Sequence, residues 1–124
     1  MAKVSNKNLL IEWIEENDYI IDYPAILGST NSAYDNVYWA DIPDKRMNAN
    51  FYLLLNDKIK CEVHLFFIPK GSINPDLFSK KSGKSSIQIK YNDCDFTDIR
   101  SGSKRVKFSK YKLATIDYPE DLLD

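Results

Sequence analysis

Residues 50–68 hold the pattern that most constrains what this chain can fold into. Every second side chain from 59 to 67 is apolar, and polar or charged residues alternate with them from 58 to 64. The apolar positions are Ile59, Cys61, Val63, Leu65 and Phe67, and the polar positions are Lys58, Lys60, Glu62 and His64. Because side chains alternate between the faces of a strand, this pattern predicts a half-buried antiparallel strand. Asn56 and Asp57 tolerate positive φ, so a tight hairpin to the preceding run, 51–55, is predicted there.

An amphipathic helix is predicted near the N-terminus, over about residues 6–17. Ser5 is a favourable N-cap residue for it. Apolar side chains repeat at the spacing of one helical face, at Leu9, Leu10, Trp13 and Ile14. The helix macrodipole disfavours anions in the C-terminal half, yet four carboxylates gather there, on Glu12, Glu15, Glu16 and Asp18. This acidic face is therefore either solvated or in contact with basic groups.

The rest of the chain is predicted to be β-rich over residues 19–116, followed by a short acidic tail, 117–124. A proline and two acids in the tail are typical of the first turn of a short helix. β-like segments occur at 19–23, 37–42, 87–91, 95–99, 105–108 and 111–116. We expect one α+β domain, 1–124, with an antiparallel β-sheet and the N-terminal helix packed on one face. Its core is predicted to contain Phe51, Leu53, Ile59, Val63, Leu65, Phe67, Ile87, Ile89 and Val106.

Composition limits the class of protein. With 124 residues, of which 44% are hydrophobic, the chain is long enough to bury one core and too short for two. The sequence runs directly into the predicted helix without a signal peptide, and no apolar run approaches the roughly 20 residues of a membrane span. We therefore expect a cytoplasmic protein that does not contact the membrane. Abundant lysine, asparagine and isoleucine with little arginine fit AT-rich coding, and hence a bacterial, phage or mobile-element origin.

Metal, cofactor and nucleophile motifs are missing from the sequence. Cys61, Cys94 and the single histidine, His64, do not supply the ligands of a structural zinc site. Four dispersed glycines form neither a GxGxxG nor a Walker A motif, and no serine lies in a GxSxG context. His64 is expected on the solvent face of its strand. We therefore predict no metal, no cofactor, and a binding protein rather than an enzyme.

One arrangement of a carboxylate and a lysine resembles a nuclease motif. Pro75-Asp76 is followed by Gln88-Ile89-Lys90 on a predicted strand, which loosely resembles the PD-(D/E)xK nucleases. The resemblance covers about sixteen residues and implies Asp76 as a metal ligand, Gln88 as a weakened one and Lys90 as the catalytic lysine. Glutamine departs from the pattern because it cannot supply the anionic charge that Mg²⁺ prefers. The alternative interpretation makes Asp76 a turn residue.

Charge is strongly segregated along the chain. Residues 1–55 carry a net charge of −4, residues 56–114 a net +7, and residues 115–124 a net −4, although the total is only −1. From 100 to 113 the cations alternate with apolar residues, which predicts one exposed basic face next to a lysine-containing loop. The candidate cations are Lys80, Lys81, Lys84, Lys90, Arg100, Lys104, Arg105, Lys107, Lys110 and Lys112.

This basic β/loop surface, residues 80–112, predicts a small domain that contacts nucleic-acid phosphates. The scarcity of arginine argues against bidentate reading of base edges. The first alternative is a protein-binding inhibitor or immunity-type factor whose partner is an acidic protein. The second is the metal-dependent nuclease with Asp76 and Lys90. The sequence does not distinguish DNA from RNA and does not set the oligomeric state.

Overall fold

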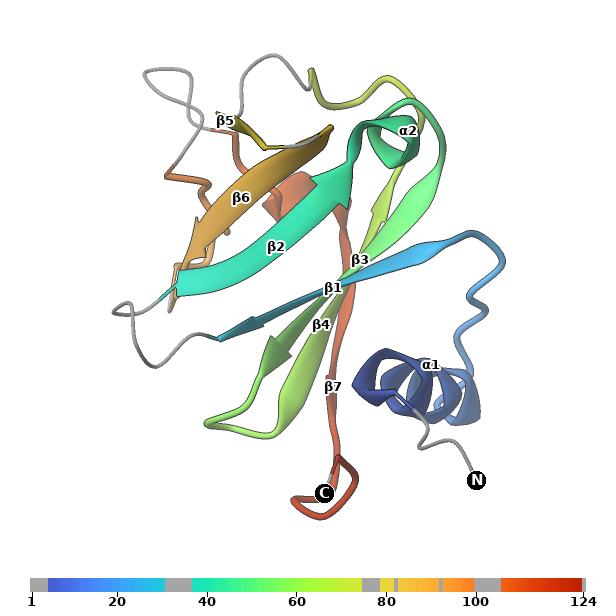
Figure 1. Cartoon of the computed structure of the whole chain (residues 1–124). Helices are drawn as coiled ribbons and strands as arrows, with labels where there is room; N and C mark the ends of the chain where they lie inside the picture. The colour runs from blue at the N-terminus through green and yellow to red at the C-terminus, as the bar shows by residue number, and fades with distance from the viewer. Residues whose placement is uncertain are drawn as a thin grey trace.

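The computed structural model describes residues 5–30, 37–74, 79–81, 83–91, 93–99 and 106–123, with the backbone alone for 79–81 (Figure 1). The fold is α+β, and one mixed β-sheet carries most of these residues. The helical elements are α1 (Asn6–Glu16), the single turn α2 (Asp44–Met47) and the 3-10 helix η2 (Ser109–Tyr111). The strands of the sheet are β1 (Ala25–Thr30), β2 (Val37–Pro43), β3 (Phe51–Asp57), β4 (Glu62–Ile68), β5 (Ser79–Lys81), β6 (Lys84–Lys90) and β7 (Lys112–Asp117).

The seven strands are ordered β5-β6-β2-β1-β3-β4-β7. Every neighbouring pair is antiparallel except β1 and β3, which are parallel. The expected antiparallel sheet is therefore mostly right and wrong for this one pair. The chain leaves β1 through β2 and α2 before β3 returns on the other side of β1, so it re-enters the sheet in the same direction. β1 and β2 pack closely at Gly28. A Cβ there would lie 2.9 Å from the Ala40 Cβ on β2, which is too close for any residue but glycine.

Both faces of the central strand β3 are covered, and each face carries a separate core. Every residue of β3 is buried. Phe51, Leu53 and Leu55 belong to the first core, whereas Tyr52 and Leu54 belong to the second. The sheet therefore lies between two apolar layers, and a strand at its centre lacks the polar face that an alternating pattern requires.

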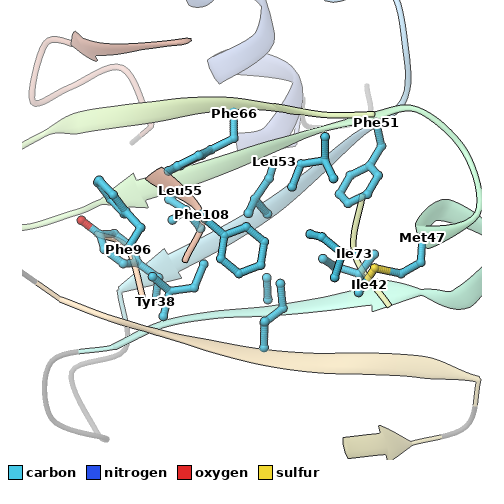
Figure 2. Close-up of a cluster of buried hydrophobic side chains, with 14 residues drawn as sticks. Tyr38, Ile42, Met47, Phe51, Leu53, Leu55, Phe66, Ile73, Phe96 and Phe108 are labelled. Atoms are coloured by element: carbon cyan, nitrogen blue, oxygen red, sulfur yellow. The ribbon is translucent and has the colours of Figure 1, made fainter. Parts of the chain in front are cut away.

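The first core fills the concave side of the curved sheet. Figure 2 shows Phe108 lying between side chains of β3 and β4 on one side and of β2 on the other. Ile87 and Ile89 of β6 are both fully buried in this core. Phe108 comes directly before η2, so the short described segment 106–111 covers this side of the sheet.

The second core is formed where α1 packs on the sheet. Leu10 and Ile14 are fully buried there, and Trp13 is partly buried. The Ser5 side chain accepts a hydrogen bond from the Asn8 backbone N–H at 3.2 Å, as expected of an N-cap. The Trp13 indole N–H donates to the Asp117 backbone carbonyl at 2.8 Å, which fixes the helix beside β7. The predicted helix and its position on one face of the sheet are confirmed.

The hairpin between β3 and β4 turns later than the sequence predicts. Asn56 and Asp57 are the last residues of β3, and residues 58–61 form the turn. The Asp57 carboxylate accepts hydrogen bonds from the backbone N–H groups of Ile59 and Lys60, both at 3.0 Å, and this holds the turn. Ile59 is therefore 74% exposed, and its predicted place in the core is wrong.

Two further expectations for the strands are wrong. β4 is not half-buried, because Phe66 and Ile68 on its other face are buried as well. The alternation predicted from 100 to 113 fails at Leu113, which is 53% exposed instead of pointing toward the core. Here η2 precedes β7, and the pairing of β4 with β7 shifts register between Leu65 and Phe66. Of the remaining predicted core residues, Phe67 and Val106 are only partly buried, while Phe51, Leu53, Val63, Leu65, Ile87 and Ile89 are buried.

The acidic tail forms a turn at residues 120–123, and no helix is present in its described part. Across the described ranges, no helix has the length and apolar character needed to cross a membrane.

Candidate functional site

A polar cavity lies at the end of the β3–β4 hairpin, and we call it the hairpin pocket. Its volume is about 230 Å³. Asp57 ends β3 and Glu62 begins β4, and the four-residue turn makes them direct cross-strand partners. His64 follows Glu62 by two residues, so its side chain lies on the same face of β4. The pocket is lined by Tyr38, Asp57, Lys60, Glu62, His64, Asp93, Cys94, Phe96 and Lys112.

The Asp57 carboxylate is the structural centre of this pocket. Only 1% of the residue is exposed. Its Oδ1 atom accepts the two backbone hydrogen bonds of the turn, and its Oδ2 atom accepts one from the Tyr91 hydroxyl at 2.8 Å. Burial and this hydrogen bond to Asp57 raise the pKa of Tyr91 to about 12. The carboxylate is thus held in a fixed orientation from two directions.

His64 is buried in this pocket, not on the surface as its position in the sequence predicts. It is 7% exposed, because β4 is covered on both faces. Its Nδ1 atom lies 2.8 Å from the Thr115 hydroxyl oxygen on β7. The rings of Tyr38 and Phe96 meet the imidazole at steep angles with centroids 6.0 and 5.0 Å away. Burial, and next the nearby Lys112, lower the pKa of His64 to about 4, so the ring is neutral at pH 7.

Glu62 completes a group of three donor side chains. Burial, followed by the adjacent Asp57, raises the pKa of the Glu62 carboxyl group. Its Oε1 atom lies 3.6 Å from Nε2 of His64. One donor atom from each of Asp57, Glu62 and His64 lies within 4.8 Å of the others. Nitrogen and carboxylate oxygen atoms converging at this spacing form a donor set that a divalent cation can use.

The wall of the pocket opposite the hairpin is the loop after β6. Phe96 adopts a φ of +49°, a left-handed conformation that is costly for an aromatic residue. Asp93 stabilises the loop by accepting hydrogen bonds from the backbone N–H groups of Thr97 and Asp95, at 3.0 and 3.4 Å. Hydrogen bonds from Thr97 lower the pKa of Asp93. The loop thereby places Phe96 against His64 and leaves the Cys94 thiol exposed.

A second surface, the outer face of β2 and β6, carries several of the residues predicted from sequence. Ile87 and Ile89 point into the first core, so Gln88 and Lys90 point outward. Gln88 is the cross-strand partner of Trp39 on β2, and Trp39 is partly buried. Lys84 and Lys90 lie at the two ends of β6, about 20 Å apart at roughly 3.3 Å per residue.

The described cations do not share one continuous sheet face. Lys107 forms an ion pair with Asp95 at 3.6 Å. The Lys110 ammonium lies 5.2 Å from the Tyr111 ring centroid, and that of Lys112 lies 5.1 Å from the Phe96 ring centroid at the hairpin pocket. Arg100, Lys104 and Arg105 lie outside the described residues, and only the backbone is described for Lys80 and Lys81.

The nuclease-like constellation is described only in part. Asp76 lies outside the described residues. Gln88 and Lys90 share the outer face, and the Gln88 backbone N–H donates to the Asp98 carboxylate at 3.0 Å. The group of metal-binding side chains that the described chain brings together is instead Asp57, Glu62 and His64. The sequence analysis missed this group, because a tight turn at Asn56 and Asp57 does not bring Asp57 opposite Glu62.

Comparison with known proteins gives no further guidance. No family model, no curated protein and no solved structure matches the chain. Function is therefore argued from the side chains and their arrangement.

Proposed function

We propose that the chain binds single-stranded nucleic acid through the outer face of β2 and β6. This proposal rests on one observation: the Trp39 ring lies on that face between Lys84 and Lys90, at the two ends of β6. Trp39 pairs with Gln88 across the two strands, and Lys90 lies two residues further along β6. Aromatic rings stack on bases of any sequence, while lysines follow the phosphate backbone.

The loop after β6 carries no cation among its described residues, but it links the end of this face to Lys107. The Lys90 backbone N–H donates to the Thr97 carbonyl at 2.9 Å, and Thr97 in turn forms a β-bridge with Lys107. Phe108 points into the first core, so the neighbouring Lys107 points away from it. These contacts support a path for a phosphate backbone from β6 across residues 97 and 107.

A cavity at the end of this path supports the same proposal. Its volume is about 410 Å³, and Lys107 and Lys110 lie on its wall together with the Tyr111 ring. The Ser109 and Asn74 side chains also reach it, so hydrogen-bond donors accompany the two ammonium groups. Such a lining suits a phosphate with an adjoining base or sugar.

The first experiment measures the salt dependence of binding to oligo(dT) and oligo(U). The affinity should fall linearly with salt on a log–log plot, because each phosphate contact in a single strand adds about 0.7 to the slope. Replacing Lys84 and Lys90 together by glutamine should reduce the slope by roughly 1.4. The matched control replaces Lys58 and Lys70, which are exposed but lie off this face, and should leave the slope unchanged.

The second experiment tests the position of the bound strand. In the Trp13→Phe variant, Trp39 is the only tryptophan, and its fluorescence should be quenched when oligo(dT) binds. The Trp39→Phe variant retains Trp13, which packs beside β7 and should not respond. Equal quenching of both tryptophans, or no binding at about 50 mM salt, would refute the proposal and leave a protein partner as the next candidate.

A further inference from the structure

We propose that the hairpin pocket is a binding site for a divalent transition-metal ion, with Asp57, Glu62 and His64 as its protein ligands. This site is independent of the nucleic-acid surface proposed above and uses none of its cations. It also differs from the nuclease-like constellation, whose members lie elsewhere in the sequence.

Two carboxylates, those of Asp57 and Glu62, lie side by side in this pocket. Asp57 and Glu62 are direct partners across the hairpin, and Asp57 is almost completely buried. Like charges that face each other across a sheet destabilise it, and burial increases the cost. Neither carboxylate forms an ion pair with a lysine or arginine in the described part of the chain. A divalent cation between them would remove this repulsion.

A buried imidazole lies beside the same carboxylates. His64 is more than nine-tenths buried, and its Nε2 atom lies 3.6 Å from Glu62 Oε1 and forms no hydrogen bond within the described part of the chain. If Nδ1–H donates to the Thr115 hydroxyl, Nε2 presents a lone pair to a carboxylate oxygen 3.6 Å away. Two acceptors facing each other are unfavourable unless a cation lies between them. An imidazole fixed through its second nitrogen is the usual arrangement of a metal-binding histidine.

The donor set favours zinc over magnesium. One imidazole nitrogen and two carboxylates supply three ligands, and such sites keep a fourth position open to water. Magnesium prefers six oxygen ligands, so a nitrogen-containing site suits it poorly. The Tyr91 hydroxyl on Asp57 and the Thr115 hydroxyl on His64 would orient two of the ligands from outside. We expect affinity to rise from Mg²⁺ through Mn²⁺ to Zn²⁺.

The test is calorimetric titration of the EDTA-treated full chain with ZnCl₂. The wild type should bind one equivalent. Two variants should each weaken binding by at least about tenfold. They are Glu62→Gln, at the partly exposed rim, and His64→Phe, which keeps an aromatic ring between its neighbours. Glu12→Gln on α1 is the matched control and should bind as the wild type does. Cys94→Ser should also retain binding, because the proposed ligands do not include this thiol.

A second readout identifies the ligand atom. The chain has one histidine, so the imidazole nitrogen signals in a ¹⁵N NMR spectrum belong to His64 alone. Zinc should shift the Nε2 signal and leave Nδ1 protonated. Absence of one-equivalent binding in the wild type would overturn the proposal. Binding that both folded variants retain, or zinc binding to the wild type that leaves its imidazole nitrogen signals unchanged, would overturn it equally.

Discussion

At the residue scale, Asn56 and Tyr118 form a buried polar pair beside the second core. Asn56 is fully buried, and its Oδ1 atom accepts a hydrogen bond from the Tyr118 hydroxyl. Among the residues that the structure describes, the Asn56 Nδ2 group has no hydrogen-bond partner. Burial is the main cause that raises the pKa of Tyr118 to about 12, so this hydroxyl remains a donor throughout the physiological range. One tyrosine thus satisfies part of an amide that would otherwise be wholly unpaired.

Tyr118→Phe should therefore destabilise the fold by about 1–3 kcal/mol, the cost of leaving a buried amide unpaired. Urea unfolding of the variant and the wild type measures the difference. The double variant Asn56→Leu/Tyr118→Phe removes both polar partners and should recover much of this loss. If Tyr118→Phe unfolds at the wild-type urea concentration, the hydrogen bond contributes nothing to stability.

The hairpin pocket shows which residue-scale features the sequence does not reveal. The sequence places Glu62 and His64 on one strand face, and this is correct. It does not say that the face is covered, which depends on Tyr38 and Phe96 arriving from distant segments. The burial of His64, and with it the lowered pKa, is therefore a tertiary effect. The pairing of Asp57 with Glu62 required the turn to be placed at 58–61.

At the scale of elements, the β3–β4 hairpin separates what alternation predicts from what it does not. Val63 and Leu65 are buried as the pattern requires. The same pattern extends back to Ile59, but the Asp57 side chain caps the turn there and the strand begins only at Glu62. Alternation reports which side chains share a face, and it does not report where a strand begins. Local side-chain hydrogen bonds decided that boundary.

A pair of aspartate substitutions tests this boundary. Val63→Asp buries an unpaired carboxylate in the second core and should cost about 3–5 kcal/mol, a large part of a typical total of about 5–15 kcal/mol. Ile59→Asp changes an exposed turn residue and should stay within about 0.5 kcal/mol of the wild type. Thermal unfolding followed by circular dichroism compares the two variants. Similar losses in both would mean that the strand extends back to Ile59.

At the scale of the whole molecule, part of the charge segregation of the sequence becomes a separation in space. The acidic helix α1 contacts β7 through Trp13, and Leu122 and Leu123 of the acidic tail pack against the same core. β7 is one edge of the sheet, while β6 and its lysines lie next to the other edge (Figure 1). The acidic helix and the acidic tail therefore gather on the side of the molecule away from the outer face of β6, whereas Asp41 and Asp44 lie beside β6 itself.

The glutamates of α1 do not neutralise the basic region directly. Within the described part of the chain, Glu12, Glu15 and Glu16 are exposed and form no ion pair. Their effect on a bound polyanion is therefore limited to long-range repulsion. In water, two unit charges about 30 Å apart, roughly the diameter of a small domain, interact by only about 0.1 kcal/mol. Salt at 0.15 M screens even this, because the Debye length is then about 8 Å.

Neutralising all three glutamates to glutamine should consequently tighten the binding of oligo(dT) by roughly two- to fivefold at 10 mM salt, where the Debye length is about 30 Å. At 150 mM salt the variant and the wild type should bind alike. Fluorescence anisotropy at both salt concentrations measures the effect, and sedimentation at the same concentrations records the oligomeric state. A gain that persists at 150 mM would instead mean that α1 contacts the cations of β6 directly. Because the two lie on opposite sides of one chain, that contact would have to come from a second copy, and the wild type should then sediment as a dimer that the substitutions dissociate.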